Sequence, residues 1–106
     1  SIIEMNDEFI KQIEEKFRVP ERVADKLQIK AEKRMSGYVI YEFRPRWDNP
    51  IEWMKFDVAK LVKKKTGRWD LYWKRASGKW EIYRKNNLFN SVLNIIEQDE
   101  YGCFWG

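Results

Sequence analysis

The residues best suited to bind a ligand lie in one short segment near the middle of the chain. It reads Arg44-Pro45-Arg46-Trp47-Asp48-Asn49-Pro50. Two guanidinium groups held apart by a proline can bind phosphate or carboxylate oxygens in a forked geometry, and an indole can stack on a base. A structural interpretation is favoured over ligand binding, although loop segments of this kind often serve both purposes. In it, Asp48 and Asn49 before Pro50 form a turn, Trp47 caps the core, and an arginine pairs with Asp48 or Glu52.

A second group of candidates lies further along, where lysines and arginines alternate with aromatic residues between positions 60 and 85. In a strand, alternate residues share a face, so Trp69, Leu71 and Trp73 are expected on one side and Tyr72 on the other. A tyrosine among lysines and arginines is typical of platforms that bind single-stranded nucleic acid. It is equally typical of an ordinary solvated sheet face.

The same alternation groups Trp80 with Ile82 and puts Tyr83 on the opposite side. We therefore expect the tryptophans in the core and the tyrosines outside, although Asp70 and Glu81 on the tyrosine side argue against a strong phosphate surface. The ligand-binding residues expected from both segments are Arg44, Arg46, Trp47, Lys60, Lys63, Arg68, Tyr72, Lys74, Tyr83 and Lys85.

The charge distribution supports an anionic partner for the middle of the chain. Residues 27–85 contain sixteen basic and seven acidic side chains, a net charge of +9, whereas residues 1–26 and 86–106 carry −2 and −3. A basic segment of this kind favours nucleic acid. With a chain length of 106 residues, we expect a single domain over residues 1–106.

Several classes of catalyst are excluded by composition. The chain has no histidine, which removes catalytic triads, Cys–His dyads and histidine-liganded zinc. Its five glycines form no phosphate-binding or dinucleotide-binding loop. Asp48, Glu52 and Asp57 could hold Mg²⁺, but acids at loop edges are far more often solvated or paired. We expect no metal, no cofactor and no catalytic residue, and the sequence favours a protein that is not an enzyme.

The single cysteine and the acidic N-terminal residues suggest a cellular compartment. Cys103 cannot form an intrachain disulfide, which suits a reducing cytoplasm, and beside Phe104 it is expected to act as a small buried hydrophobe. Acidic residues stand at 4, 7 and 8, where a signal peptide would be basic and then apolar. No stretch approaches the roughly 18 apolar residues of a membrane span. We expect a cytoplasmic protein with no membrane contact.

The elements that must position these residues follow from hydrophobic periodicity. Phe9, Ile13 and Phe17 predict a first helix capped by Asn6 or Asp7, and Pro20 opens a second, short helix through about residue 26. The period then changes to two, which predicts five strands. They cover residues 27–31, 38–44, 56–63, 68–75 and 79–85, and a last helix follows, capped by residue 86 or 87.

The short links between these strands favour an antiparallel meander. The expected fold is therefore α+β, a single domain with N-terminal helices and a C-terminal helix on one face of a five-strand antiparallel sheet.

The chain also resembles a known family. Four motifs carry the resemblance, namely Arg44-Pro45-Arg46-Trp47-Asp48-Asn49-Pro50, Val58-Ala59-Lys60-Leu61, Trp69-Asp70-Leu71-Tyr72-Trp73 with Lys79-Trp80-Glu81-Ile82-Tyr83, and the terminal Gly102-Cys103-Phe104-Trp105-Gly106. They are similar to those of a bacterial family of domains of unknown function, number three-zero-two-four, in which Phe usually stands in place of Trp105. The resemblance implies a bacterial, cytoplasmic origin and no particular activity.

The C-terminal residues give a structural expectation of their own. Leaving both Phe104 and Trp105 in water would waste several kcal/mol at about 25 cal/mol per Å² of apolar surface. We therefore expect residues 102–106 to pack on the domain, with Trp47 within reach of them.

Two hypotheses of function follow. The first is a nucleic-acid-binding domain that uses the basic aromatic sheet and the Arg44–Trp47 loop. The alternative is a protein-interaction or structural module, with homodimers among its forms, because Trp, Tyr and Arg are typical interface anchors.

Overall fold

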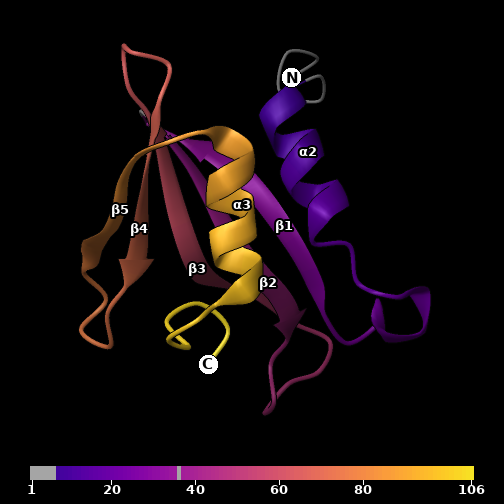
Figure 1. The fold of residues 1–106 in the computed structure, drawn as a ribbon. Coiled ribbons are helices and arrows are strands. Elements are labelled where there is room, and N and C mark those ends of the chain that lie inside the picture. Colours follow the sequence, from indigo (N-terminus) through magenta and orange to yellow (C-terminus); the bar gives the residue numbers. More distant parts are fainter. Residues whose placement is uncertain (1–6, 36) are drawn as a thin grey trace.

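Five antiparallel strands follow one another along the chain and pair in the same order, β1-β2-β3-β4-β5. The computed structural model describes residues 7–35 and 37–106. The strands are β1 (Gln28–Arg34), β2 (Gly37–Pro45), β3 (Trp53–Lys63), β4 (Trp69–Lys74) and β5 (Trp80–Asn87). Helices α2 (Glu8–Lys16) and α3 (Phe89–Gln98) lie side by side on one face of the sheet (Figure 1). The expected α+β meander is confirmed.

Helix α2 begins where the sequence places it. The carboxylate of Asp7 accepts hydrogen bonds from the backbone N–H groups of Phe9 and Ile10, at 2.9 and 3.2 Å, which satisfies two free donors of the first turn. The alternative cap, Asn6, lies outside the described residues. The second N-terminal helix is a single 3-10 turn, η1 (Glu21–Val23), and ends before the predicted residue 26.

The β2–β3 pair is the longest in the sheet. Strand β3 begins at Trp53, three residues before the predicted start at 56, because β2 continues to Pro45 and pairs with Trp53. The register shifts between Ile40 and Tyr41, so Val58 on β3 has no partner of its own.

The core lies between the sheet and the two helices. Its largest fully buried members come from every layer, and they are Ile13, Ile40, Leu61, Trp69, Leu71, Val92 and Ile96. The ring of Phe9 contacts those of Trp69 and Phe89 edge to face, at 5.0 Å in each case. The Tyr38 hydroxyl donates to the carboxylate of Asp7 at 2.8 Å. Burial and this carboxylate raise the pKa of Tyr38 to about 12.

Strand β5 faces the opposite way from the prediction. Ile82 lies opposite Tyr72 on the face away from the helices, and Trp80 lies opposite Lys74 on that same face. The pairing is regular from the hairpin as far as Tyr72, so Tyr83, one residue beyond Ile82, turns toward the helices and packs on Phe104. The expectation that Trp80 enters the core and Tyr83 stays outside is therefore wrong.

The start of α3 also differs from the prediction. Leu88 occupies the N-cap, with no side-chain cap, whereas Asn86 lies one residue before the end of β5, in the left-handed region at φ 59°. The amide of Asn87 donates to the carbonyl of Lys85 instead of capping the helix.

The C-terminal residues pack on the domain as expected. Phe104 is 7% exposed and meets the ring of Tyr83 edge to face at 4.9 Å. The carboxylate of Asp99 accepts from the backbone N–H groups of Phe104 and Trp105, at 3.0 and 2.9 Å, and the indole N–H of Trp105 donates to the carbonyl of Ile96 at 2.9 Å. This prediction is confirmed, and Cys103 packs half-buried beside these residues.

Candidate nucleic-acid interface

The ten predicted binding residues do not form one surface. Arg44, Arg46 and Trp47 lie at one end of the β2–β3 pair, and the β3–β4 hairpin with Arg68 lies at the other. Strand β3 has 11 residues. At about 3.3 Å per residue it separates the two regions by roughly 33 Å.

Sheet faces divide the remaining candidates further. Lys60, Tyr72 and Lys74 lie on the face away from the helices. Lys63 points to the helix side, with its ammonium 5.3 Å from the ring centre of Phe9. Tyr83 is on the helix side too, against Phe104. Lys85 is exposed near the end of β5 and Arg68 is exposed in the hairpin.

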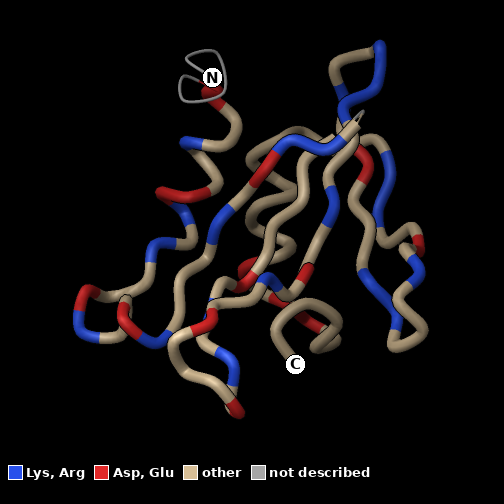
Figure 2. The backbone as a smooth tube through the Cα atoms, turned by 180° about the vertical axis from the view of Figure 1, so that it is seen from behind, with Lys and Arg blue, Asp and Glu red and all other residues tan. Residues whose placement is uncertain are grey.

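In the part of the chain that the structure describes, no helix covers the face of the sheet seen in Figure 2. Five side chains from β3, β4 and β5 meet there, and cross-strand pairing fixes their positions. We call them the aromatic–lysine patch: Lys60, Tyr72, Lys74, Trp80 and Ile82. They are half-buried, except for Ile82, which is 38% exposed.

A lysine lies over each aromatic ring of the patch. The ammonium of Lys60 is 5.8 Å from the ring centre of Tyr72, and that of Lys74 is 5.6 Å from that of Trp80. Such contacts contribute about 0.5–1 kcal/mol at exposed sites. Lys60 can therefore leave its ring at small cost, which would free the ring for a base and the ammonium for a phosphate. The ammonium of Lys74 is also held by Asp57, at 3.4 Å.

The other half of this face is closed by an ion-pair cluster of Glu32, Arg34, Lys55 and Asp57. Arg34 binds Asp57 through two hydrogen bonds, at 2.9 and 3.0 Å, and contacts Glu32 at 2.6 Å. Lys55 completes the cluster, with its ammonium 3.2 Å from Glu32. On the same face, Val39 and Tyr41 are only 1% and 7% exposed. The apolar stems of these long charged side chains shield Val39 and Tyr41 from water, as the helices shield the core on the other face.

The pKa values of the cluster reflect these contacts. The hydrogen bond from Arg34 lowers the pKa of Glu32. Burial alone would raise the pKa of Asp57, but Arg34 and Lys74 outweigh it and lower that pKa. Both carboxylates are therefore held in the charged form, and basic side chains of the sheet neutralise them.

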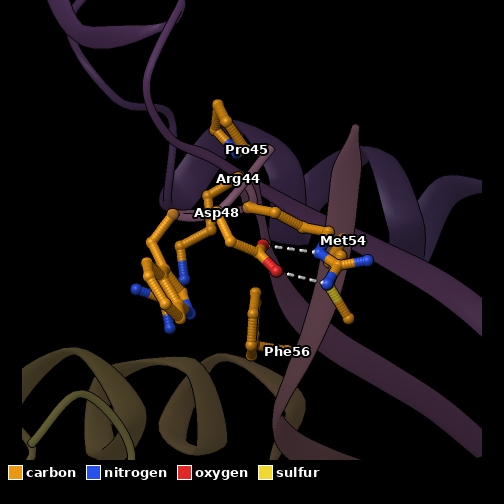
Figure 3. Close-up of a pocket in the computed structure, with 7 residues that line it drawn as sticks. Arg44, Pro45, Asp48, Met54 and Phe56 are labelled. Carbon is orange, nitrogen blue, oxygen red and sulfur yellow. Dashed lines mark hydrogen bonds and ion pairs between the residues drawn. The ribbon is translucent and has the colours of Figure 1, made fainter. Parts of the chain in front are cut away.

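A hollow of about 290 Å³ lies at the β2–β3 loop, lined by Arg44, Pro45, Arg46, Trp47, Asp48, Met54 and Phe56 (Figure 3). Arg46 donates to both carboxylate oxygens of Asp48, at 2.9 and 2.7 Å, and to Glu52 at 3.3 Å. The predicted arginine pairing is confirmed. Trp47 is 95% exposed, so the predictions that it caps the core and shares cover with the C-terminal residues are wrong.

The carboxylates that could have held Mg²⁺ are engaged elsewhere. Asp48 and Glu52 pair with Arg46, and Asp57 pairs with Arg34 and Lys74. Among the described residues, no group of three or more Cys, Asp or Glu side chains is placed to hold a metal ion. Nor does any helix in these ranges have the length and apolarity needed to cross a membrane.

Sequence reasoning missed four residues of these two sites. Trp80 and Ile82 join the patch because they pair with Lys74 and Tyr72, whereas their apolar character favoured the core. Met54 and Phe56 line the loop hollow. The signal for Phe56 was available, because in a long hairpin it pairs with Glu42, which shares a strand face with Arg44.

Comparison with family models gives one match, to the Domain of unknown function (DUF3024), over residues 3–106. The chain belongs to this family. The comparisons with curated proteins and with solved structures gave no match. Membership in DUF3024 confirms the resemblance suggested by the motifs, and it brings no activity with it.

Proposed function

We propose that this DUF3024 domain binds single-stranded nucleic acid through the aromatic–lysine patch. The observation that carries the proposal is the pairing of two aromatic rings with two lysines on a sheet face that no described helix covers. Single-strand binders combine stacking rings with nearby cations, and stacking on an aromatic side chain contributes about 1–3 kcal/mol per base. That gain exceeds the cost of moving a lysine off the ring.

The charge around the patch favours a polyanion. Within the described residues, Lys60 has no carboxylate at ion-pair distance, and the nearest acid of β3, Asp57, is bound by Arg34. Asp70, further along the same face, accepts from the backbone N–H of Asn86 at 3.1 Å and lies 4.0 Å from Lys64. Figure 2 shows further basic residues at the tip of the β3–β4 hairpin and along β5.

The test is fluorescence anisotropy with labelled single strands of about 15 nucleotides, at about 50 mM and about 200 mM salt. We expect micromolar binding that weakens with salt. Tyr72→Ala should weaken it roughly 5- to 150-fold, the equivalent of one lost stacking contact. Lys60→Gln should reduce the slope of log affinity against log salt by about 0.7.

Two controls match these variants. Lys55→Gln removes the same charge from the same face, but from the ion-pair cluster. Tyr101→Ala removes an aromatic side chain that is 68% exposed elsewhere. Neither should change the affinity as much as its counterpart. Absence of binding at low salt would refute the proposal.

We further propose that the domain acts in a bacterial cytoplasm, which its single cysteine and the family resemblance support. A second candidate function, protein interaction, is supported by a different feature, the exposed Trp47 of the loop hollow.

A further inference from the structure

Apolar side chains are exposed unusually densely around the loop hollow. Trp47 and Ile51 are 95% and 91% exposed, and Met54 and Phe56 are 41% and 37% exposed. These four fall within ten residues of chain and make up half of the exposed large hydrophobic side chains in the described ranges. Apolar surface gathered in this way marks a site of interaction, whereas isolated exposed residues do not.

The loop is held in place by its own contacts. The backbone N–H of Arg46 donates to the carbonyl of Glu52 at 2.8 Å, and that of Glu52 donates to Asn49 at 3.0 Å. The side chain of Arg46 adds the bonds to Asp48 and Glu52. None of these contacts uses the indole of Trp47, so the loop presents this ring to solvent on a fixed support.

The two arginines of the loop differ in their partners. Arg46 is neutralised by two carboxylates. Arg44 has no carboxylate within ion-pair distance among the described residues, and its guanidinium carbon lies 4.1 Å from the ring centre of Phe56. A guanidinium stacked on a ring keeps its N–H groups at the edge, where they can bind one carboxylate through two hydrogen bonds.

Charge and size narrow the class of ligand. The side chains of Arg44 and Arg46 balance those of Asp48 and Glu52, so the site as a whole is neutral and has no preference for a polyanion. A volume of about 290 Å³ is at the lower limit for sites that enclose a whole small molecule. It suits one or two side chains of a longer chain.

We infer that the loop hollow is a docking site for a segment of a partner protein that carries apolar side chains and one Asp or Glu. The apolar side chains of the partner pack on Trp47 and Met54, and its carboxylate binds the guanidinium of Arg44. Trp, Arg and Met are enriched at the centres of protein interfaces. This site lies apart from the aromatic–lysine patch and does not depend on it.

The test begins with a random dodecapeptide library displayed on phage and selected on the intact domain, with the Trp47→Ala variant used to remove background. Because this indole is 95% exposed, its removal should leave the fold unchanged. We expect enriched peptides to carry one Asp or Glu beside Leu, Ile, Phe or Trp. Synthetic copies should lose at least tenfold in affinity for Trp47→Ala, with Tyr101→Ala as the control.

A double-mutant cycle then tests the ion pair. Replacing the peptide carboxylate by an amide should weaken binding to the natural domain several-fold, and Arg44→Gln should cause a similar loss. Combining both changes should cause little further loss. Arg22→Gln, which removes an exposed arginine elsewhere, should bind the peptide unchanged.

Four outcomes would overturn the inference: no enrichment above the Trp47→Ala background, enriched peptides without a carboxylate, additive losses in the cycle, or occupation of the hollow by something else. Two occupants are tested directly. A dT12 oligonucleotide whose binding depends on Trp47 would make the hollow a nucleic-acid site. Self-association that Trp47→Ala abolishes, measured by light scattering, would make it a homodimer interface.

Discussion

Phe104 links the C-terminal residues to the sheet, and its truncation should be among the most damaging changes in the chain. The ring is 7% exposed, packs on Tyr83 at 4.9 Å, and its backbone N–H is held by Asp99 at 3.0 Å. Phe104→Ala removes a buried ring. In protein cores such changes cost about 3–5 kcal/mol. We expect the lower end, about 3 kcal/mol, because a terminal segment can close part of the cavity.

For a domain of this size, 1 kcal/mol lowers Tm by roughly 4–8 °C. Phe104→Ala should therefore lower Tm by roughly 12–24 °C in a thermal melt followed by circular dichroism. Tyr101→Ala, only three residues away but 68% exposed, is the control and should change Tm by no more than a few degrees. Equal melting temperatures for the natural chain and Phe104→Ala would refute the conclusion that these residues are part of the core.

Two further predictions concern the dependence of stability on pH. The pKa values of Glu32 and Asp57 are lower in the folded chain, so the stability they contribute is present above about pH 4 and is lost as the pH falls below it. Asp57→Asn should cost about 1–2 kcal/mol at pH 7 in urea unfolding and flatten the acid limb, and an unchanged acid limb would contradict this assignment. The pKa of Tyr38 is raised to about 12, so its contribution is complete below about pH 10 and is lost as the pH rises toward 12. Tyr38→Phe should therefore lose less stability than the natural chain over that interval, and an equal loss would show that other groups dominate.

Strand identity and order could be predicted because they depend on local signals. The alternation of Trp69, Leu71 and Trp73 with Tyr72 holds in the structure, because the pairing of β4 with β3 has no register shift. The turns at Gly67 and Gly78 have positive φ, as hairpin glycines do. The pairing of Arg46 was also predictable, because its carboxylate partners lie within six residues of it.

The faces of β5 could not be predicted, because they depend on how two strands pair. The alternation over residues 80–83 holds, but alternation alone does not show which side is the core. Pairing with Lys74 and Tyr72 puts Trp80 and Ile82 on the face away from the helices. The prediction that Trp47 is buried was wrong for another reason. A large ring usually finds cover, but the contacts that order this loop do not involve it, and the sequence cannot show where cover is missing.

The most direct test of the proposed function is to map the interface residue by residue. A uniformly ¹⁵N-labelled domain would be titrated with a single strand of about ten nucleotides, and amide shifts recorded by NMR. The proposal predicts that the largest changes occur at Lys60, Tyr72 and Ile82 on the face away from the helices, with α2 unaffected. Changes confined to the helix side, or none at saturating strand, would contradict it.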